Sequence, residues 1–299
     1  MTIGTQSLLQ SWSAPLGVNV SLGLGALVYT RGWLRLHAAS SKLISIWRFA
    51  AFVAGISSIW VAIGSPLEAF DDVSLTVHMV QHLLLMSVGP PLILLGAPTL
   101  PILRGLPQPM ARAVAGPILR SGPVKWFGRL AAHPIICWLA AALALIGWHI
   151  PTVFELALHW DWLHELEHAT FLGSGLLFWW PVVQPWPSAA RWPRWSIPLY
   201  LFCATLPCDA LSGFLVFCNH VVYPSYLIAP SVFAMSPLED QECAAALMWT
   251  CVTIIFLVPA VLVTLEILSP QKTHLREDTC ASLHGVSGQS LPTSELEVI

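Results

Sequence analysis

Charged residues are scarce in this sequence. Asp, Glu, Lys and Arg make up 10% of its 299 residues, whereas a soluble domain carries about 25%. This scarcity excludes a soluble enzyme or binding domain of ordinary composition, and the 56% hydrophobic content indicates an integral membrane protein that contacts the lipid bilayer. The net charge of −3 is also too small to favour a nucleic-acid partner.

Basic residues are absent from the first 30 positions. A secretory signal peptide begins with a positively charged segment, so we expect no cleavable signal peptide. The seven cysteines lie mostly in apolar stretches, which favours packed thiols over a disulfide framework. Cys218 and Cys243 are the two that an oxidising space would reach.

Long apolar runs are abundant. A helix needs about 20 apolar residues to cross a bilayer, and the sequence predicts seven such spans. They cover residues 13–36, 44–65, 75–97, 134–150, 162–182, 196–217 and 244–268. Pro90-Pro91 predicts a kink in the third span. The fold class is therefore an all-α integral membrane protein, with a transmembrane bundle over 1–268 and a polar, disordered tail over 269–299.

All 13 Lys and Arg residues fall on one side of this seven-span arrangement, and ten acidic residues fall on the other. The positive-inside rule makes the basic side cytoplasmic. The N-terminus is then outside and the C-terminus cytoplasmic. Five of the basic residues lie in the 98–133 connection, which we expect to be an ordinary loop rather than an interfacial helix.

Histidines gather at the acidic end of the predicted bundle. Two pairs have members four residues apart, at the starts of the third and fifth spans, so each pair projects from one helix face. Paired imidazoles suit copper, zinc, iron and nickel, and ionisable groups within spans usually face the interior. The candidate metal ligands are His78, His82, His164, His168, His149 and Asp209, with Glu167, Asp240, Cys243 and Met248 as secondary candidates.

Each candidate also has an ordinary structural interpretation. A single histidine pair at a span end is commonly interfacial, and His149, just before Pro151, can cap a free carbonyl. Asp209 can bond a neighbouring helix, and Met248 can simply pack. The metal hypothesis depends on two histidine pairs and Asp209 sharing one depth of the bundle.

Three enzyme or cofactor alternatives remain open. The stretch HELEH, residues 164–168, fits both the H-E-x-x-H pattern of zinc peptidases and the inverted H-x-x-E-H pattern. Asp209 is available as the third ligand that a zinc peptidase needs, but this interpretation leaves His78 and His82 unexplained. Histidines on separate helices also suit axial ligation of haem, or a di-iron hydroxylase.

Three segments together resemble a known family. They are HMVQHLLLMSVGPPLILLGAP (78–98), WHIPTVFELALHWDWLHELEHATFLGSGLLFWWPVV (148–183) and SPLEDQECAAALMW (236–249). They are similar to the CtaG-type family of caa-type cytochrome c oxidase assembly factors, over about residues 15–268. The residues that match the family's pattern are His78, His82, His149, His164, Glu167, His168, Asp240 and Gln241. Glu165 departs from it, because the family usually has a small apolar residue there.

The resemblance implies a multi-span, non-enzymatic protein of the bacterial plasma membrane that helps to mature a haem-copper oxidase, with oxidase subunits as partners. Copper(I) accepts His, Met and Cys ligands. We therefore expect a copper-holding histidine site open to the outer face, with an acidic rim, including Asp240, that attracts cations. Pro90-Pro91 and Gly173 with Gly175 would let the site adapt for release. The alternative is a metal-free scaffold for oxidase subunits.

Overall fold

The computed structural model describes residues 12, 15–39, 44–110, 113, 117, 121–131, 133–185, 193–229 and 235–269, and every regular element within these ranges is a helix. The all-α fold class is therefore confirmed. The predicted tail lies outside the described residues, apart from Ser269.

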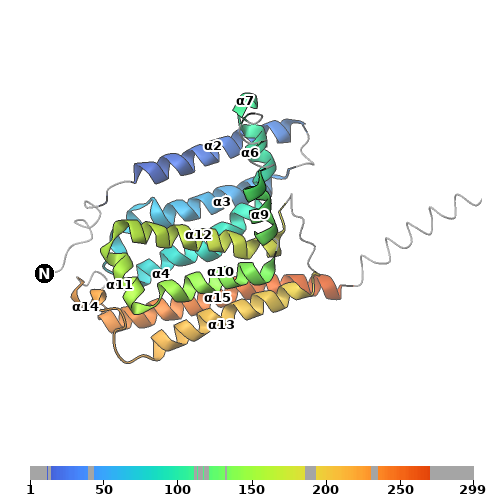
Figure 1. The fold of residues 1–299 in the computed structure, drawn as a ribbon. Helices are drawn as coiled ribbons and strands as arrows, with labels where there is room; N and C mark the ends of the chain where they lie inside the picture. The colour runs from blue at the N-terminus through green and yellow to red at the C-terminus, as the bar shows by residue number, and fades with distance from the viewer. Residues whose placement is uncertain are drawn as a thin grey trace, which may run out of the picture.

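Long helical segments lie side by side in a bundle, and each overlaps one predicted span (Figure 1). They are α2 (Leu16–Ala39), α3 (Ile46–Ile63), α4 (Leu75–Leu83) continued by η2 (Leu84–Val88) and α5 (Gly89–Leu95), α10 (Pro134–Trp148), α12 (Asp161–Val183), α13 (Ser196–Phe217) and α15 (Pro237–Leu268). The described chain thus enters the bundle at one end with α2 and leaves at the other with α15.

Some of these helices are long and apolar enough to be candidate membrane spans. Four segments are long and apolar enough to cross a bilayer: Ile46–Phe70, Leu75–Leu95, Ser196–Phe217 and Pro237–Leu268. Helix α10 and the following α11 (Pro151–His159) make a fifth if this pair, bent by 76°, counts as one broken span. The protein is a membrane protein on this measure, whereas the count of seven crossings stays a prediction.

Short helices cover the two ends of the bundle (Figure 1). At one end lie η1 (Pro66–Phe70), α11 and α14 (Ser225–Ile228), and at the other lie α6 (Thr99–Gly105), α7 (Gln108–Met110) and α9 (Gly122–Ala131). The expectation of an ordinary loop over 98–133 is therefore wrong for α6 and α9. Helix α6 packs so closely on α2 that a Cβ on Gly32 would lie 1.7 Å from the carbonyl oxygen of Pro101, so only glycine fits there.

Charge divides between the two ends. Arg48 begins α3, Arg104 lies in α6, and Arg194 precedes α13, where its guanidinium donates to Glu266 Oε2 at 3.0 Å. Those elements meet at one end of the bundle, whereas the helix starts that carry Asp161 and Asp240 meet at the other (Figure 1). The predicted separation of charge is confirmed for these described residues, and which side faces the cytoplasm stays a prediction.

The third span contains an irregular turn rather than a break. A π-helical turn, η2, immediately precedes α5, which carries Pro90 and Pro91 in its first turn, and the whole segment runs on as Leu75–Leu95. The wider turn accommodates residues that cannot donate a backbone hydrogen bond. Helix α12 packs directly against it, since a Cβ on Gly175 would lie 2.6 Å from the Met86 carbonyl oxygen. Gly175 thus permits close packing, whereas Gly173 faces open space, and a hinge at either residue stays a prediction.

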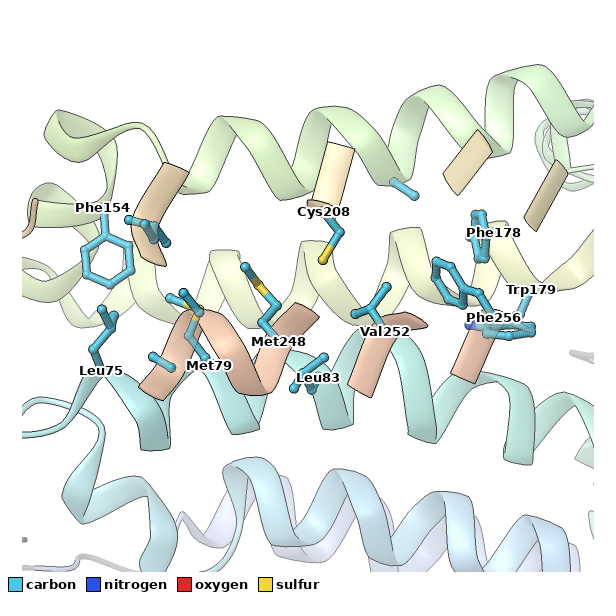
Figure 2. Packing of buried hydrophobic residues seen from close by; sticks show 14 of the residues in the cluster. Leu75, Met79, Leu83, Phe154, Phe178, Trp179, Cys208, Met248, Val252 and Phe256 are labelled. Carbon is cyan, nitrogen blue, oxygen red and sulfur yellow. The ribbon is translucent and has the colours of Figure 1, made fainter. Parts of the chain in front are cut away.

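The main hydrophobic core lies between α4, α12, α13 and α15 (Figure 2). Met79 and Leu83 from α4 meet Met248 and Val252 from α15, and Phe178 of α12 stacks on Phe256 at 5.2 Å between ring centroids. This core fixes the rotation of α4 and α12 and so decides which of their side chains face each other.

Candidate metal centre

Helices α4 and α12 bring both predicted histidine pairs together. His78 and His82 have ring centroids 4.4 Å apart on α4, and His164 and His168 have centroids 4.3 Å apart on α12. The His78 and His164 rings face each other across the two helices at 5.3 Å. The spacing of four residues therefore gave the correct helix face in both cases.

Glu167 lies inside this histidine cluster with none of its surface exposed. Its Oε1 is 3.5 Å from His82 Nε2 and 4.0 Å from His78 Nε2. Both distances exceed the usual N–H···O range of about 2.7–3.2 Å. Donor atoms that share one metal ion through bonds of about 2.0–2.2 Å lie roughly 3–4 Å apart. The spacing of these three side chains suits a shared ion better than it suits hydrogen bonding.

Several polar atoms of the cluster have no hydrogen-bond partner within the described residues. They are both ring nitrogens of His78 and of His82, both carboxylate oxygens of Glu167, and Nε2 of His164 and His168. A buried polar group left unpaired costs about 1–3 kcal/mol, and native structures rarely leave several in one place. A bound cation would satisfy the atoms that converge, which are one ring nitrogen each of His78 and His82 and one oxygen of Glu167, because a neutral imidazole offers a lone pair on one of its two nitrogens.

Asp71 makes a second group with the same histidines. The ligand atoms of Asp71, His78 and His164 all lie within 4.8 Å of one another, and Asp71 Oδ2 is 3.7 Å from His164 Nε2. Burial, followed by the nearby charge of Asp72, raises the pKa of the Asp71 carboxyl to about 8. Because His78 belongs to both groups, the cluster offers two adjoining positions for a cation.

His149 stands at the 76° bend between α10 and α11. Its Nδ1–H donates to the carbonyl oxygen of Leu145 at 2.7 Å, so the expected capping of the helix end is present. Its Nε2 lies 3.2 Å from Met79 Sδ, and its ring centroid is 6.1 Å from that of His82. The Tyr223 hydroxyl donates to the His149 carbonyl oxygen and fixes the bend.

Three other candidates lie apart from the cluster. Asp209, on α13, belongs to neither convergent group among the described residues, and its Oδ1 is buried without a partner there. Cys243 is exposed on α15, and both it and Cys218 are free thiols. Met248 is buried in the hydrophobic core. Asp209 and Cys243 therefore belong to neither convergent group of ligand atoms, whereas Met248 lies in the core with Met79.

The EDQ motif is structural. Glu239 completes a capping box with Ser236. Asp240 accepts hydrogen bonds from the backbone N–H groups of Leu75 and Thr76, so it caps α4 and does not belong to the expected cation-attracting rim. Gln241 holds the turn after α13, because its Oε1 accepts from Val222 N–H and its Nε2 donates to two backbone carbonyls.

The two glutamates of HELEH point in different directions. Glu165 is exposed, whereas Glu167 is fully buried beside His78 and His82. The H-E-x-x-H interpretation therefore loses the carboxylate that would activate water, and only the inverted spacing places a glutamate among the histidines. Asp71 and Met79 were not expected at the site. Asp71 lies just before α4 and Met79 directly follows His78, but no spacing in the sequence marks either residue as a ligand.

The fold and the site define a helical membrane protein that encloses a histidine and carboxylate centre near one end of its bundle. Residues 27–269 match the family described as the cytochrome c oxidase caa3 assembly factor, Caa3_CtaG, and the chain belongs to this family. Uncharacterized proteins of Mycobacterium bovis and Mycobacterium tuberculosis are each 24% identical to it over 269 residues, which cover 86% of this chain and 40% of the relative. This chain therefore spans well under half the length of these relatives. No solved structure matches it.

Proposed function

We propose that this protein binds copper for the assembly of a haem-copper cytochrome c oxidase, holding the ion between His78, His82 and Glu167. The convergence of these side chains at distances too long for hydrogen bonds carries the proposal. Copper binds nitrogen donors more tightly than other first-row divalent metals do. Family membership supports the link to an oxidase.

The surroundings of the cluster suit the entry of a cation. His164 is the most exposed member at 18% of its side-chain surface, so it provides the way in. Exposed carboxylates stand beside it in the first turns of α12, at Asp161 and Glu165. Such acidic groups raise the local concentration of cations. The positive-inside rule puts this end at the outer face of the bacterial plasma membrane.

The proposed role requires no turnover. Holding an ion and passing it to an oxidase subunit breaks no covalent bond, so the protein acts as a binding and assembly factor and not as an enzyme. The cluster lies close enough to a solvated end for a partner subunit to approach it. Each ligand sits on a helix whose packing fixes its position before the ion arrives.

Metal content is the direct test. The full chain, purified in detergent and loaded anaerobically with copper(I), is compared with a His78→Gln/His82→Gln variant by mass spectrometry of bound metals. A His159→Gln/His220→Gln variant is the control, since both residues are exposed. Near-stoichiometric copper that is lost in the first variant and kept in the control is the expected result.

Other outcomes overturn the copper assignment. Zinc lost with the cluster would return attention to a peptidase, and iron with a Soret absorption band would indicate a cytochrome. A chain that binds no metal would leave a scaffold for oxidase subunits. In a deletion strain, we expect oxidase activity to return with the wild-type gene or with added copper, and not with the His78→Gln/His82→Gln variant.

A further inference from the structure

The contact between His149 and Met79 is unusual in its chemistry. A carbonyl oxygen can only accept, so the 2.7 Å bond to Leu145 requires the proton of His149 on Nδ1. In the neutral ring Nε2 then carries a lone pair, and it faces Met79 Sδ at 3.2 Å. A thioether sulfur has no proton to offer. Two soft donor atoms therefore face each other with no hydrogen between them.

The separation is close to that of two donors on one metal ion. An ion bonded to nitrogen at about 2.0 Å and to sulfur at about 2.3 Å, with a tetrahedral angle between the bonds, holds its donors about 3.5 Å apart, so a shift of a few tenths of an ångström admits one. Both side chains are buried, with Met79 1% and His149 4% exposed. Met79 lies on α4, directly after His78, and His149 lies at the bend between α10 and α11.

More sulfur surrounds the same place. A partly open cavity of about 50 Å³ lies between the core helices, and Met79 and His82 line it. Further sulfur atoms on its walls come from Met86, Met248 and Cys208, so three of the six methionines in the protein line one cavity. Figure 2 shows Met248 and Cys208 extending from different helices into this region. A cavity of this size admits an ion or a water molecule.

Methionine often fills gaps in a core, yet here several methionines surround a gap without closing it. The cavity is otherwise mostly apolar, with Phe171 and Phe178 in its walls, and Ser87 supplies the one side-chain hydroxyl of its lining, so a hard divalent ion would lack the several oxygen ligands that it requires. Thioether and imidazole donors select soft monovalent ions such as copper(I) or silver(I). The donors therefore change from carboxylate and imidazole near the end of the bundle to imidazole and sulfur further inside.

We infer that His149 Nε2 and Met79 Sδ form a second, soft-metal position for copper(I), distinct from the His78–His82–Glu167 position and completed by sulfur from the adjoining cavity. This inference rests on the proposed function, because it makes the sulfur position a neighbour of the histidine cluster. His82 belongs to the cluster and also lines the cavity, so one side chain joins the two positions. An ion can pass between them without a change of oxidation state.

The test is X-ray absorption spectroscopy at the copper edge on the full chain, loaded anaerobically with copper(I). We expect sulfur scattering at about 2.3 Å in the wild-type protein and a clear decrease in Met79→Leu, which keeps the size of the side chain but removes one sulfur ligand. Met110→Leu, the same change at an exposed position outside the cavity, is the control and should keep the signal. A Met79→Ile variant repeats the test if Met79→Leu purifies poorly.

The two proposals fail in different ways. Copper bound through nitrogen and oxygen alone, or sulfur scattering that is undiminished in Met79→Leu and Met79→Ile, overturns the soft-metal position and leaves the histidine site. If the His78→Gln/Glu167→Gln variant binds as much copper as the wild type and gives the same sulfur spectrum, the histidine site is overturned and the soft-metal position remains. A wild-type chain that binds no copper(I) overturns both.

Discussion

The carboxylate of Asp240 caps a helix that begins 165 residues earlier in the chain. Its Oδ2 accepts a hydrogen bond of 2.7 Å from the backbone N–H of Leu75, in the first turn of α4. The first N–H groups of a helix have no partner within the helix, and a carboxylate there also favours the helix dipole. Helix α15 thereby holds the start of the helix that carries His78 and His82.

We expect Asp240→Ala to destabilise the protein and to lower its copper content. The change leaves the N–H of Leu75 and the hydroxyl of Ser74 without their acceptor, and each buried unpaired group costs about 1–3 kcal/mol. Thermal unfolding in detergent measures the first effect and metal analysis the second. Glu242→Ala, an exposed change in the same helix, should do neither. Equal unfolding temperatures for the two variants would count against the cap.

A glycine pair on α12 offers a matched packing test. A Cβ on Gly175 would lie 2.6 Å from the Met86 backbone oxygen, whereas one on Gly173 would have nothing within 4 Å. Gly175→Ala should destabilise by about 1–3 kcal/mol through overpacking and should disturb the cluster, since α12 carries His164 and His168. Gly173→Ala should stabilise by about 0.5–1 kcal/mol. Similar effects of the two changes on unfolding would show that α12 is not tightly held.

The two glutamates of HELEH separate metal holding from peptidase chemistry. Glu167→Gln replaces a buried carboxylate oxygen near His82 Nε2 with a neutral amide, so copper content should fall sharply. Glu165→Gln changes an exposed side chain and should leave the copper content unchanged. Metal analysis of both purified variants decides. A loss confined to Glu165→Gln would restore the H-E-x-x-H interpretation.

Two tyrosines make similar bonds at opposite ends of the core. Tyr223 donates to the carbonyl oxygen of His149 at 3.1 Å, and Tyr200 donates to that of Phe178 at 2.9 Å. We expect Tyr223→Phe and Tyr200→Phe each to cost about 0.5–1.5 kcal/mol. Only Tyr223→Phe should change the copper spectrum, because it frees the bend that presents His149. An identical spectral change in both variants would point to general loosening of the bundle.

The orientation prediction needs its own measurement. Fusion of a fluorescent protein after residue 268 should give fluorescence, and fusion of a periplasm-dependent phosphatase at the same point should give no activity, because the positive-inside rule puts this end in the cytoplasm. A fusion after Trp160, the single residue between α11 and α12, should give the reverse result. Phosphatase activity at residue 268 would invert the arrangement and place the histidine cluster on the cytoplasmic side.

The sequence predicted the helices and the two histidine pairs because both follow from local periodicity. Apolar runs mark a membrane helix, and residues four apart share a face whatever the helix packs against. The sequence could not give the rotation of one helix relative to another. Asp209 was expected beside the cluster, yet it belongs to neither convergent group of ligand atoms. Glu167 was ranked below it and lies between His78 and His82, because the packing of α12 on α4 decides which carboxylate faces inward.

Met79 and Asp240 illustrate the other limit. Met79 follows His78 directly and carries no spacing signal, so its contact with His149 depends on a bend 70 residues further along the chain. Asp240 was expected to attract cations at the rim and instead caps α4. Its charge and approximate position were correct, but its hydrogen-bonding partner comes from a distant part of the chain.

The separation of charge along the bundle bears on how an ion would travel. Carboxylates surround one end and arginines the other, so a cation moving inward from the acidic end meets a growing electrostatic barrier. Under the proposed function, a copper ion would therefore enter and leave at the acidic end and would not cross the bundle. The ion would then be bound and released at the same end of the bundle. A protein that receives the ion would have to dock on the same side as the source that delivers it.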